Sequence, residues 1–297
     1  MSTKQYRYLK PADVKGLESY EFAVKAMVEG YQAGRHRSKQ RGSSTEFHEY
    51  RQYAPGDDPS LVDWRVFARS DRHYLKTFEE ETNMECHVFL DSSASMGYRG
   101  SAELSKLEYA SFFAACLSWL VIAKNDRVSL QIFDQEIRKH LPSGSTRQHL
   151  HEILTALENN QPRAETSLGE ALRRAEPMIK RKGTLVVVSD FYDEPEAIFR
   201  GLSPYLHRGF RVYLAHVLSP DEAHLEGGGM ARFQDMESGE KLTLHADTIR
   251  DAYAEEMQEH LRSLRRLASS RQVDYVQVTT ESSYFELLDR LTTRNAR

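Results

Sequence analysis

The chain has 297 residues, of which 40% are hydrophobic and 28% charged, the composition of an ordinary globular protein. Lys and Arg number 40 against 44 Asp and Glu, so the net charge of -4 gives no overall attraction to nucleic acid or to an anionic membrane. Cys86 and Cys116 both lie in apolar runs, and we expect them to be reduced core residues of a cytoplasmic protein.

The first residues, MSTKQYRYLKPADVKGL, lack the apolar stretch of a signal peptide. The longest apolar run, SFFAACLSWLVIA, is shorter than the roughly 20 residues that a membrane span needs. It ends in charged residues and is typical of a buried helix. We therefore expect a soluble protein with no membrane span.

The N-terminal part of the chain predicts one helix and a small β-rich region. Apolar residues from Leu17 to Tyr31 have helical spacing, and the Gly-, Ser- and Arg-rich stretch AGRHRSKQRGSS that follows is predicted to be a loop. Residues 45–81 are rich in Tyr, Phe and Arg and contain the turn signal APGDDP, which indicates short strands around irregular loops.

From Cys86 onward, strands and helices alternate. Such alternation predicts an α/β fold with a doubly wound, mostly parallel sheet, helices on both faces and one antiparallel edge strand. We accordingly divide the chain into an N-terminal helix with a β-rich extension, residues 1–84, and an α/β domain, residues 85–297. The predicted strands are 86–91, 184–190, 210–218 and 273–280, with hairpins over 127–141 and 232–244, and the predicted helices are 102–123, 146–159, 167–180, 196–208, 246–270 and 284–292.

Three loops at the carboxyl ends of these strands carry oxygen ligands. The first, DSSAS, contains Asp91, Ser93 and Ser95; the second places Thr166 before a helix; the third ends a strand in Asp190. Ligands of doubly wound sheets bind where such loops converge. Oxygen-only ligands favour a hard cation, so we expect Mg²⁺, with Mn²⁺ or Ca²⁺ as alternatives, rather than zinc. Three interpretations of the Asp91 loop stay open at this point: a nucleophile, a ligand set or a helix cap.

DSSAS matches the DxSxS motif of von Willebrand factor A domains, and Thr166 and Asp190 follow in the order of that family's other two ligand loops. The five residues resemble a complete metal-ion-dependent adhesion site. The resemblance implies that Ser93, Ser95 and Thr166 bind the metal directly or nearly so, while Asp91 and Asp190 mainly hold metal-bound waters. The implied function is non-enzymatic binding of a partner's carboxylate.

Residues 31–100 resemble the bacterial domain-of-unknown-function 58 family, whose members are typically encoded beside MoxR-type AAA+ ATPases. The resemblance implies an adaptor or assembly cofactor whose partner is that ATPase or its client. The residues that carry it are Glu46, Phe47, Arg51, Tyr53, Gly56, Asp57, Asp58, Asp63, Trp64, Ala68 and Arg69.

Other functions compete with this interpretation. A strand-end Asp91 is also the nucleophile position of Mg²⁺-dependent phosphatases, but those need a second carboxylate two residues later, where this chain has Ser93. A purely structural protein with an empty site is the third alternative. For the acidic segment Gly56–Trp64 we favour turns, ion pairs and a packing role for Trp64. The basic stretch Arg35–Arg41 is expected to be a solvated loop that does not bind nucleic acid.

Overall fold

The computed structural model describes residues 6–17, 45–53, 62–70, 74–80, 85–163, 165, 167–223, 229–234, 236 and 241–293. These residues form two units. One contains residues 6–17 and everything from residue 85 onward; the other contains the described residues between 45 and 80. The predicted division near residue 84 thus agrees with one border, but the N-terminal residues belong to the α/β unit and not to the extension.

The central sheet of the α/β unit has six strands in the order β10-β7-β6-β3-β4-β5. Their bounds are β3 (Glu85–Asp91), β4 (Arg127–Phe133), β5 (Ile137–Gly144), β6 (Thr184–Ser189), β7 (Arg211–Leu218) and β10 (Asp274–Thr279). All neighbouring pairs are parallel except β4 and β5, so β5 is an antiparallel edge strand. The predicted fold class is confirmed.

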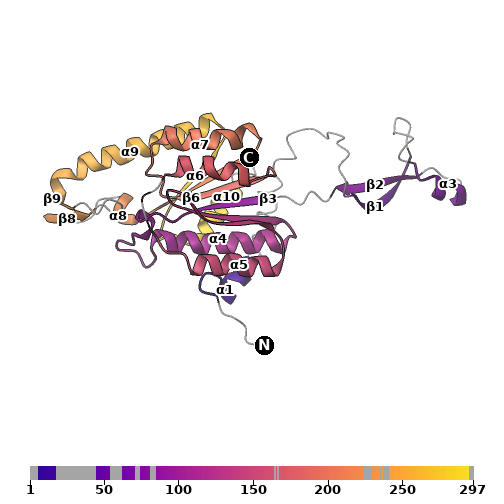
Figure 1. The fold of residues 1–297 in the computed structure, drawn as a ribbon, viewed down its shortest axis with the longest axis horizontal. Helices are drawn as coiled ribbons and strands as arrows, with labels where there is room; N and C mark the ends of the chain where they lie inside the picture. The colour runs from indigo at the N-terminus through magenta and orange to yellow at the C-terminus, as the bar shows by residue number, and fades with distance from the viewer. Residues whose placement is uncertain are drawn as a thin grey trace. The chain divides into compact units, whose positions relative to one another are not determined.

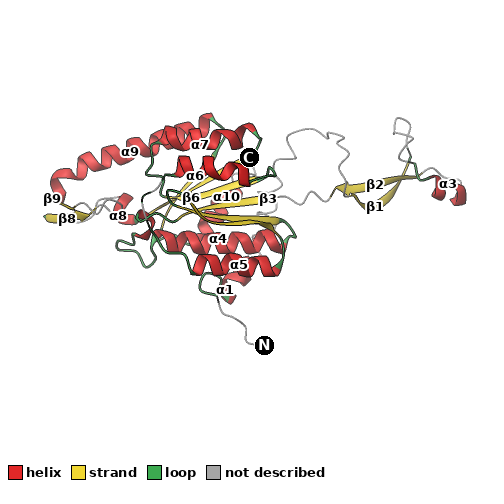
Figure 2. Cartoon of the chain, in the orientation of Figure 1, coloured by secondary structure: helices red, strands yellow, loops and turns green. Residues whose placement is uncertain are grey.

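Helices cover both faces of this sheet (Figures 1 and 2). Their bounds are α1 (Pro11–Leu17), α4 (Lys106–Ala123), α5 (Arg147–Glu158), α6 (Leu168–Ala175), α7 (Pro195–His207), α8 (Pro220–Ala223), α9 (Ala246–Ser270) and α10 (Tyr284–Thr293). In one apolar core, α1, α4, α5 and α10 pack on the sheet; in the other, α6, α7 and α9 do. Helix α6 ends earlier than predicted because Pro177 follows in a 3-10 turn, η4 (Glu176–Met178).

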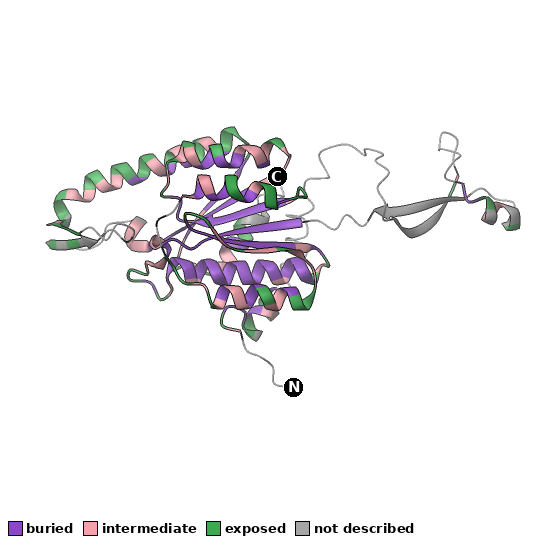
Figure 3. Cartoon of the chain, viewed as in Figure 1, coloured by how far each residue is buried: buried purple, intermediate pink, exposed green. Residues whose placement is uncertain are grey.

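Helix α4 is buried along most of its length, as are strands β3 and β6 beside it (Figure 3). Among the described residues it is the helix that is long and apolar enough to cross a membrane, yet 83% of it lies inside the protein, as in the core helix of a globular fold. Cys116 on α4 and Cys86 on β3 are free and buried, as predicted.

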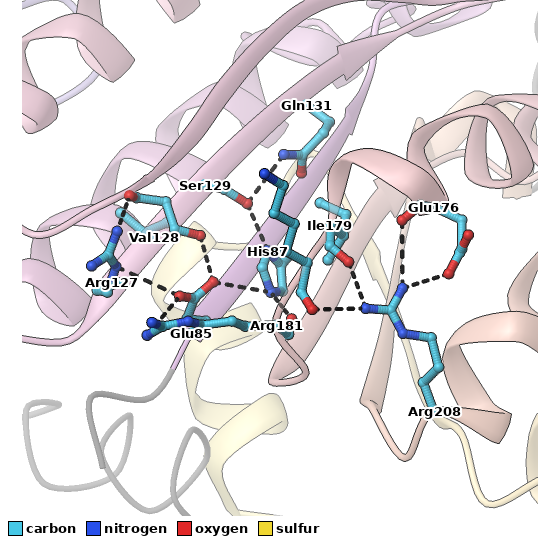
Figure 4. A network of polar contacts seen from close by, with 12 residues as sticks. Glu85, His87, Arg127, Val128, Ser129, Gln131, Glu176, Ile179, Arg181 and Arg208 are labelled. Atoms are coloured by element: carbon cyan, nitrogen blue, oxygen red, sulfur yellow. Dashed lines mark hydrogen bonds and ion pairs between the residues drawn. The ribbon is translucent and has the colours of Figure 1, made fainter. Parts of the chain in front are cut away.

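A polar network joins the amino ends of the strands, at the end of the sheet opposite to Asp91 (Figure 4). The buried His87 contacts Ser129 Oγ through Nδ1, at 2.8 Å, and the carbonyl oxygen of Arg181 through Nε2, at 3.1 Å. A carbonyl only accepts, so Nε2 donates and Nδ1 accepts from the hydroxyl. Burial lowers the pKa of His87 to about 4, and this network therefore holds a neutral imidazole.

Two short hairpins complete the described structure. In the extension, β1 (Thr45–Gln52) and β2 (Tyr74–Glu80) pair antiparallel, and α3 (Trp64–Ser70) is a helix where we expected irregular loops. Trp64 is 59% exposed and contacts Phe67 edge-on, so the predicted packing role is wrong. Near α9, β8 (Met230–Gln234) and β9 (Lys241–His245) form the second predicted hairpin. The predicted helix beyond Leu17, the basic loop and most of Gly56–Trp64 lie outside the described residues.

Candidate functional site

The DSSAS loop turns sharply at the end of β3. The backbone N–H of Ser92 donates to the carbonyl of Phe133 on β4, at 2.7 Å, and the N–H of Ser93 donates to Asp91 Oδ1, at 2.9 Å. An aspartate that accepts from the residue two positions on closes a tight local turn. The turn brings the hydroxyls of Ser93 and Ser95 within 3.0 Å of each other. Two predicted ligands therefore converge beside the Asp91 carboxylate.

The loop after β6 supplies a second carboxylate at the same edge of the sheet. Ser189 Oγ donates to Asp91 Oδ2, at 2.6 Å, and accepts from the N–H of Phe191, at 3.0 Å. Phe191 has a φ of 49°, a left-handed conformation that is strained for a bulky residue. Its carbonyl accepts from His260 Nε2 of α9, at 2.8 Å, which helps to hold the turn that carries Asp190.

Thr166, the ligand predicted in the second loop, lies outside the described residues, but both of its flanks are tied to the other loops. Before it, the N–H of Arg163 donates to the carbonyl of Ser92, at 2.9 Å. After it, the N–H of Leu168 donates to Asp193 Oδ2, at 2.5 Å. The second loop is thus anchored to the first on one side and to the third on the other.

Two carboxylates are buried close together at this edge. Asp91 is fully buried and Asp190 is 1% exposed. Burial raises the pKa of Asp91 to about 7, the charge of Asp190 adds to the effect, and the hydrogen bonds from Ser189 and Ser93 oppose it. Desolvation and like-charge repulsion both disfavour the ionised carboxylate. A cation in contact with both groups would remove this penalty.

The sequence did not predict that a lysine lies beside Asp190. Lys106 is the first residue of α4; its side chain is fully buried, and its Nζ lies 2.7 Å from Asp190 Oδ2 and 2.6 Å from Glu222 Oε1 on α8. One signal was available: a cation in the first turn of a helix opposes the helix dipole, and this one begins a helix that is mostly apolar. Glu222, on a four-residue helix far along the chain, gave no comparable signal.

The donor set has the chemistry of a hard-cation site. Asp91, Ser93, Ser95 and Asp190 provide only oxygen atoms, the ligands that Mg²⁺, Mn²⁺ and Ca²⁺ prefer. Over the described ranges, no group of three or more His, Cys, Asp or Glu side chains is placed to hold a metal ion, so hydroxyl ligands would be essential. The residues present fit such a cation, and the ligand assignment stays a prediction.

Comparison with known proteins places the chain in a family. The model of the family described as protein of unknown function DUF58 matches residues 49–263. Uncharacterized proteins of Mycobacterium tuberculosis and Mycobacterium bovis are 29% identical over 264 residues, which cover 86% of this chain and 81% of theirs.

Two solved structures that are similar to this chain are matched over nearly their whole length. BatB from Bacteroides thetaiotaomicron, a conserved hypothetical protein, matches with a TM-score of 0.50 and 19% identity over 72% of this chain and 98% of that chain. The von Willebrand factor A domain of SpRpn10 matches with a TM-score of 0.44 and 12% identity over 70% of this chain and 95% of that one. The chain belongs to the DUF58 family of proteins of unknown function and has a von Willebrand factor A-like fold.

Proposed function

We propose that this protein is a metal-dependent protein-binding module. A divalent cation, Mg²⁺ in the first place, is held by the hydroxyls of Ser93, Ser95 and Thr166, and the carboxylates of Asp91 and Asp190 hold its waters. The observation that carries the proposal is the pair of buried, mutually repelling carboxylates, Asp91 and Asp190, beside two converging serine hydroxyls.

Neutral hydroxyl ligands leave the bound cation electrophilic, because they donate lone pairs without cancelling its charge. A carboxylate from outside would complete the coordination shell. In the proposed arrangement the protein's own carboxylates, Asp91 and Asp190, hold metal-bound waters and so leave that position open. The ligand that this site recognises is therefore an Asp or Glu side chain of a partner protein.

We propose a MoxR-type AAA+ ATPase or its client as that partner, with this protein as a cytoplasmic adaptor or assembly cofactor. The resemblance of the N-terminal segment to the DUF58 family supports this choice. A module that binds and releases client proteins would serve an ATPase that remodels them. Exchange of a carboxylate ligand on a metal is one way to bind and release a partner, since the binding then depends on the cation as well as on the contact surface.

Pulldown of the ATPase by the full chain tests the proposal. We expect recovery with Mg²⁺ and loss both with EDTA and with Ser93→Ala, which removes one hydroxyl but no charge. Asp274→Asn is a control for a substitution away from the site, because Asp274 lies on β10 and pairs with Arg211. Equal recovery of the ATPase with Mg²⁺, with EDTA and with Ser93→Ala would refute metal-dependent binding of the partner.

The phosphatase alternative gains less support from the site. A nucleophilic Asp91 would need an acid two residues later, but the residue two positions on is Ser93. Turnover of a phosphomonoester with Mg²⁺ that disappears in Asp91→Asn would establish the hydrolase instead.

A further inference from the structure

Lys106 is an ammonium group enclosed by anions and aromatic rings. Its side chain is fully buried, Asp190 and Glu222 each lie within hydrogen-bond distance, and the ring centroid of Tyr192 lies 5.0 Å from Nζ. A buried ammonium is costly unless it is paired and hydrogen-bonded. Here Asp190 and Glu222 provide this pairing, with carboxylate oxygens 2.7 and 2.6 Å from Nζ.

Helix stability does not account for this position. Lys106 follows the N-cap residue Ser105, whose side chain forms a capping box with Glu108. The first turn of a helix is its positive end, where a lysine is unfavourable and an acid is preferred. The lysine is therefore held by its contacts with the Asp190 loop and with α8, and it links these two segments.

We propose that Lys106 is a resident competitor of the divalent cation: its ammonium holds Asp190 in the metal-free protein and keeps the affinity of the site for a metal low. The inference rests on the proposed function, because it concerns the same cation. Its physical basis is charge. A group that donates to Asp190 at 2.7 Å neutralises one of the two carboxylates and repels a second cation placed beside it.

Glu222 gives Lys106 a second anion when Asp190 turns toward a metal. It is itself held in place, because Glu222 Oε2 accepts from the N–H of Ser219, at 2.8 Å, and its carbonyl accepts from the hydroxyl of Tyr253 on α9, at 2.9 Å. Lys106 thus keeps one partner throughout. With a weak intrinsic affinity, the cation stays bound mainly when a partner's carboxylate joins it, which makes docking and metal binding mutually dependent.

The test is the affinity of the full chain for Mn²⁺, measured by electron paramagnetic resonance, with the folded state checked by thermal unfolding. We expect Lys106→Gln, which removes the charge, to raise the affinity at least about tenfold. Lys106→Arg keeps the charge and should stay near wild type. Lys180→Gln makes the same charge change at an exposed residue just before β6, at the other end of the sheet, and should have no effect.

The outcomes separate this inference from the proposed function. Equal or weaker binding by Lys106→Gln than by wild type overturns the inference alone. Binding by neither overturns the metal site and the inference together. Binding by Lys106→Gln but not by wild type supports the inference, since the ammonium then excludes the metal. If Lys106→Gln does not fold, Glu222→Gln replaces it: Lys106 then has Asp190 alone, so Mn²⁺ affinity must fall, and unchanged affinity overturns the inference.

Discussion

Replacing Asp91 with asparagine should stabilise the metal-free protein while abolishing its response to metal. The ionised carboxylate is buried and faces the charge of Asp190, which is why its pKa is raised. Asparagine has the same shape and no charge. Its side-chain oxygen still accepts from the N–H of Ser93, and its amide donates to the hydroxyl of Ser189, so the turn is preserved.

The size of this stability change follows from the pKa of Asp91, which is about 7 in the folded protein against an ordinary value of 3.8. At about 1.4 kcal/mol per pH unit, ionised Asp91 costs the metal-free fold up to about 4 kcal/mol above pH 7. The rearranged hydrogen bonds of the variant reduce this gain in stability by about 1 kcal/mol. We expect Asp91→Asn to raise the free energy of unfolding in EDTA by about 1–3 kcal/mol at pH 7.5, a net figure smaller than the charge term alone.

Urea unfolding in EDTA and in Mg²⁺ measures both effects. Wild type should gain stability from Mg²⁺, because a ligand that binds only the folded state stabilises it, and Asp91→Asn should gain none. A raised pKa means that the folded state binds more protons between pH 3.8 and about 7, so the advantage of the variant should shrink as the pH falls through that range. Asp274→Asn, which breaks a half-buried pair with Arg211, should lose up to about 1 kcal/mol at pH 7.5. A loss of more than about 1 kcal/mol by Asp91→Asn in EDTA would refute the reasoning.

Two further predictions concern stability. The folded pKa of His87 is about 4 against an ordinary 6.5, so the folded state binds fewer protons in that window and stability falls as pH decreases through it. Between pH 7.5 and 5 this amounts to about 2 kcal/mol, and urea unfolding of His87→Asn should show a correspondingly smaller pH dependence; an identical pH dependence would contradict the neutral network. Gly183 has no room for a side chain, because a Cβ there would lie 1.9 Å from the backbone oxygen of Glu85, so Gly183→Ala should cost more than about 2 kcal/mol in the same assay. At Gly16 the atoms nearest to an added Cβ are ring atoms of Phe285, at 3.2 Å or more, so Gly16→Ala should change stability by less than about 1 kcal/mol; similar losses in both variants would contradict this account.

The sheet was predictable from the sequence because apolar strands alternate with helices along the chain. Strand β6 is an uninterrupted apolar run, as expected for a strand covered on both faces, and it is fully buried. The placement of Asp91 and Asp190 at one edge follows from the parallel direction of β3 and β6, which brings their carboxyl ends together. The residue pattern was misleading in the extension. Helix α3 was missed because its segment is rich in aromatic residues and turn signals, which favour short strands and loops.

The electrostatic environment of the site was not predictable in the same way. The contact between Lys106 and Asp190 joins positions 84 residues apart, and that with Glu222 joins positions 116 apart. Pairing over such separations depends on how α4 and α8 pack on the sheet, which no local pattern encodes. The motif positions alone predicted ligands for a metal; the fold adds a cation of the protein's own beside them.

Anomalous diffraction from crystals grown with Mn²⁺ tests the central claim most directly. The account predicts one anomalous peak at the carboxyl end of β3, about 2.0–2.3 Å from the hydroxyl oxygens of Ser93 and Ser95, with Asp91 and Asp190 reached through water. The same peak should be absent in crystals of Ser93→Ala. A peak elsewhere, or none at Ser93 and Ser95 at millimolar Mn²⁺, would contradict the assignment of this loop as a metal-dependent docking site.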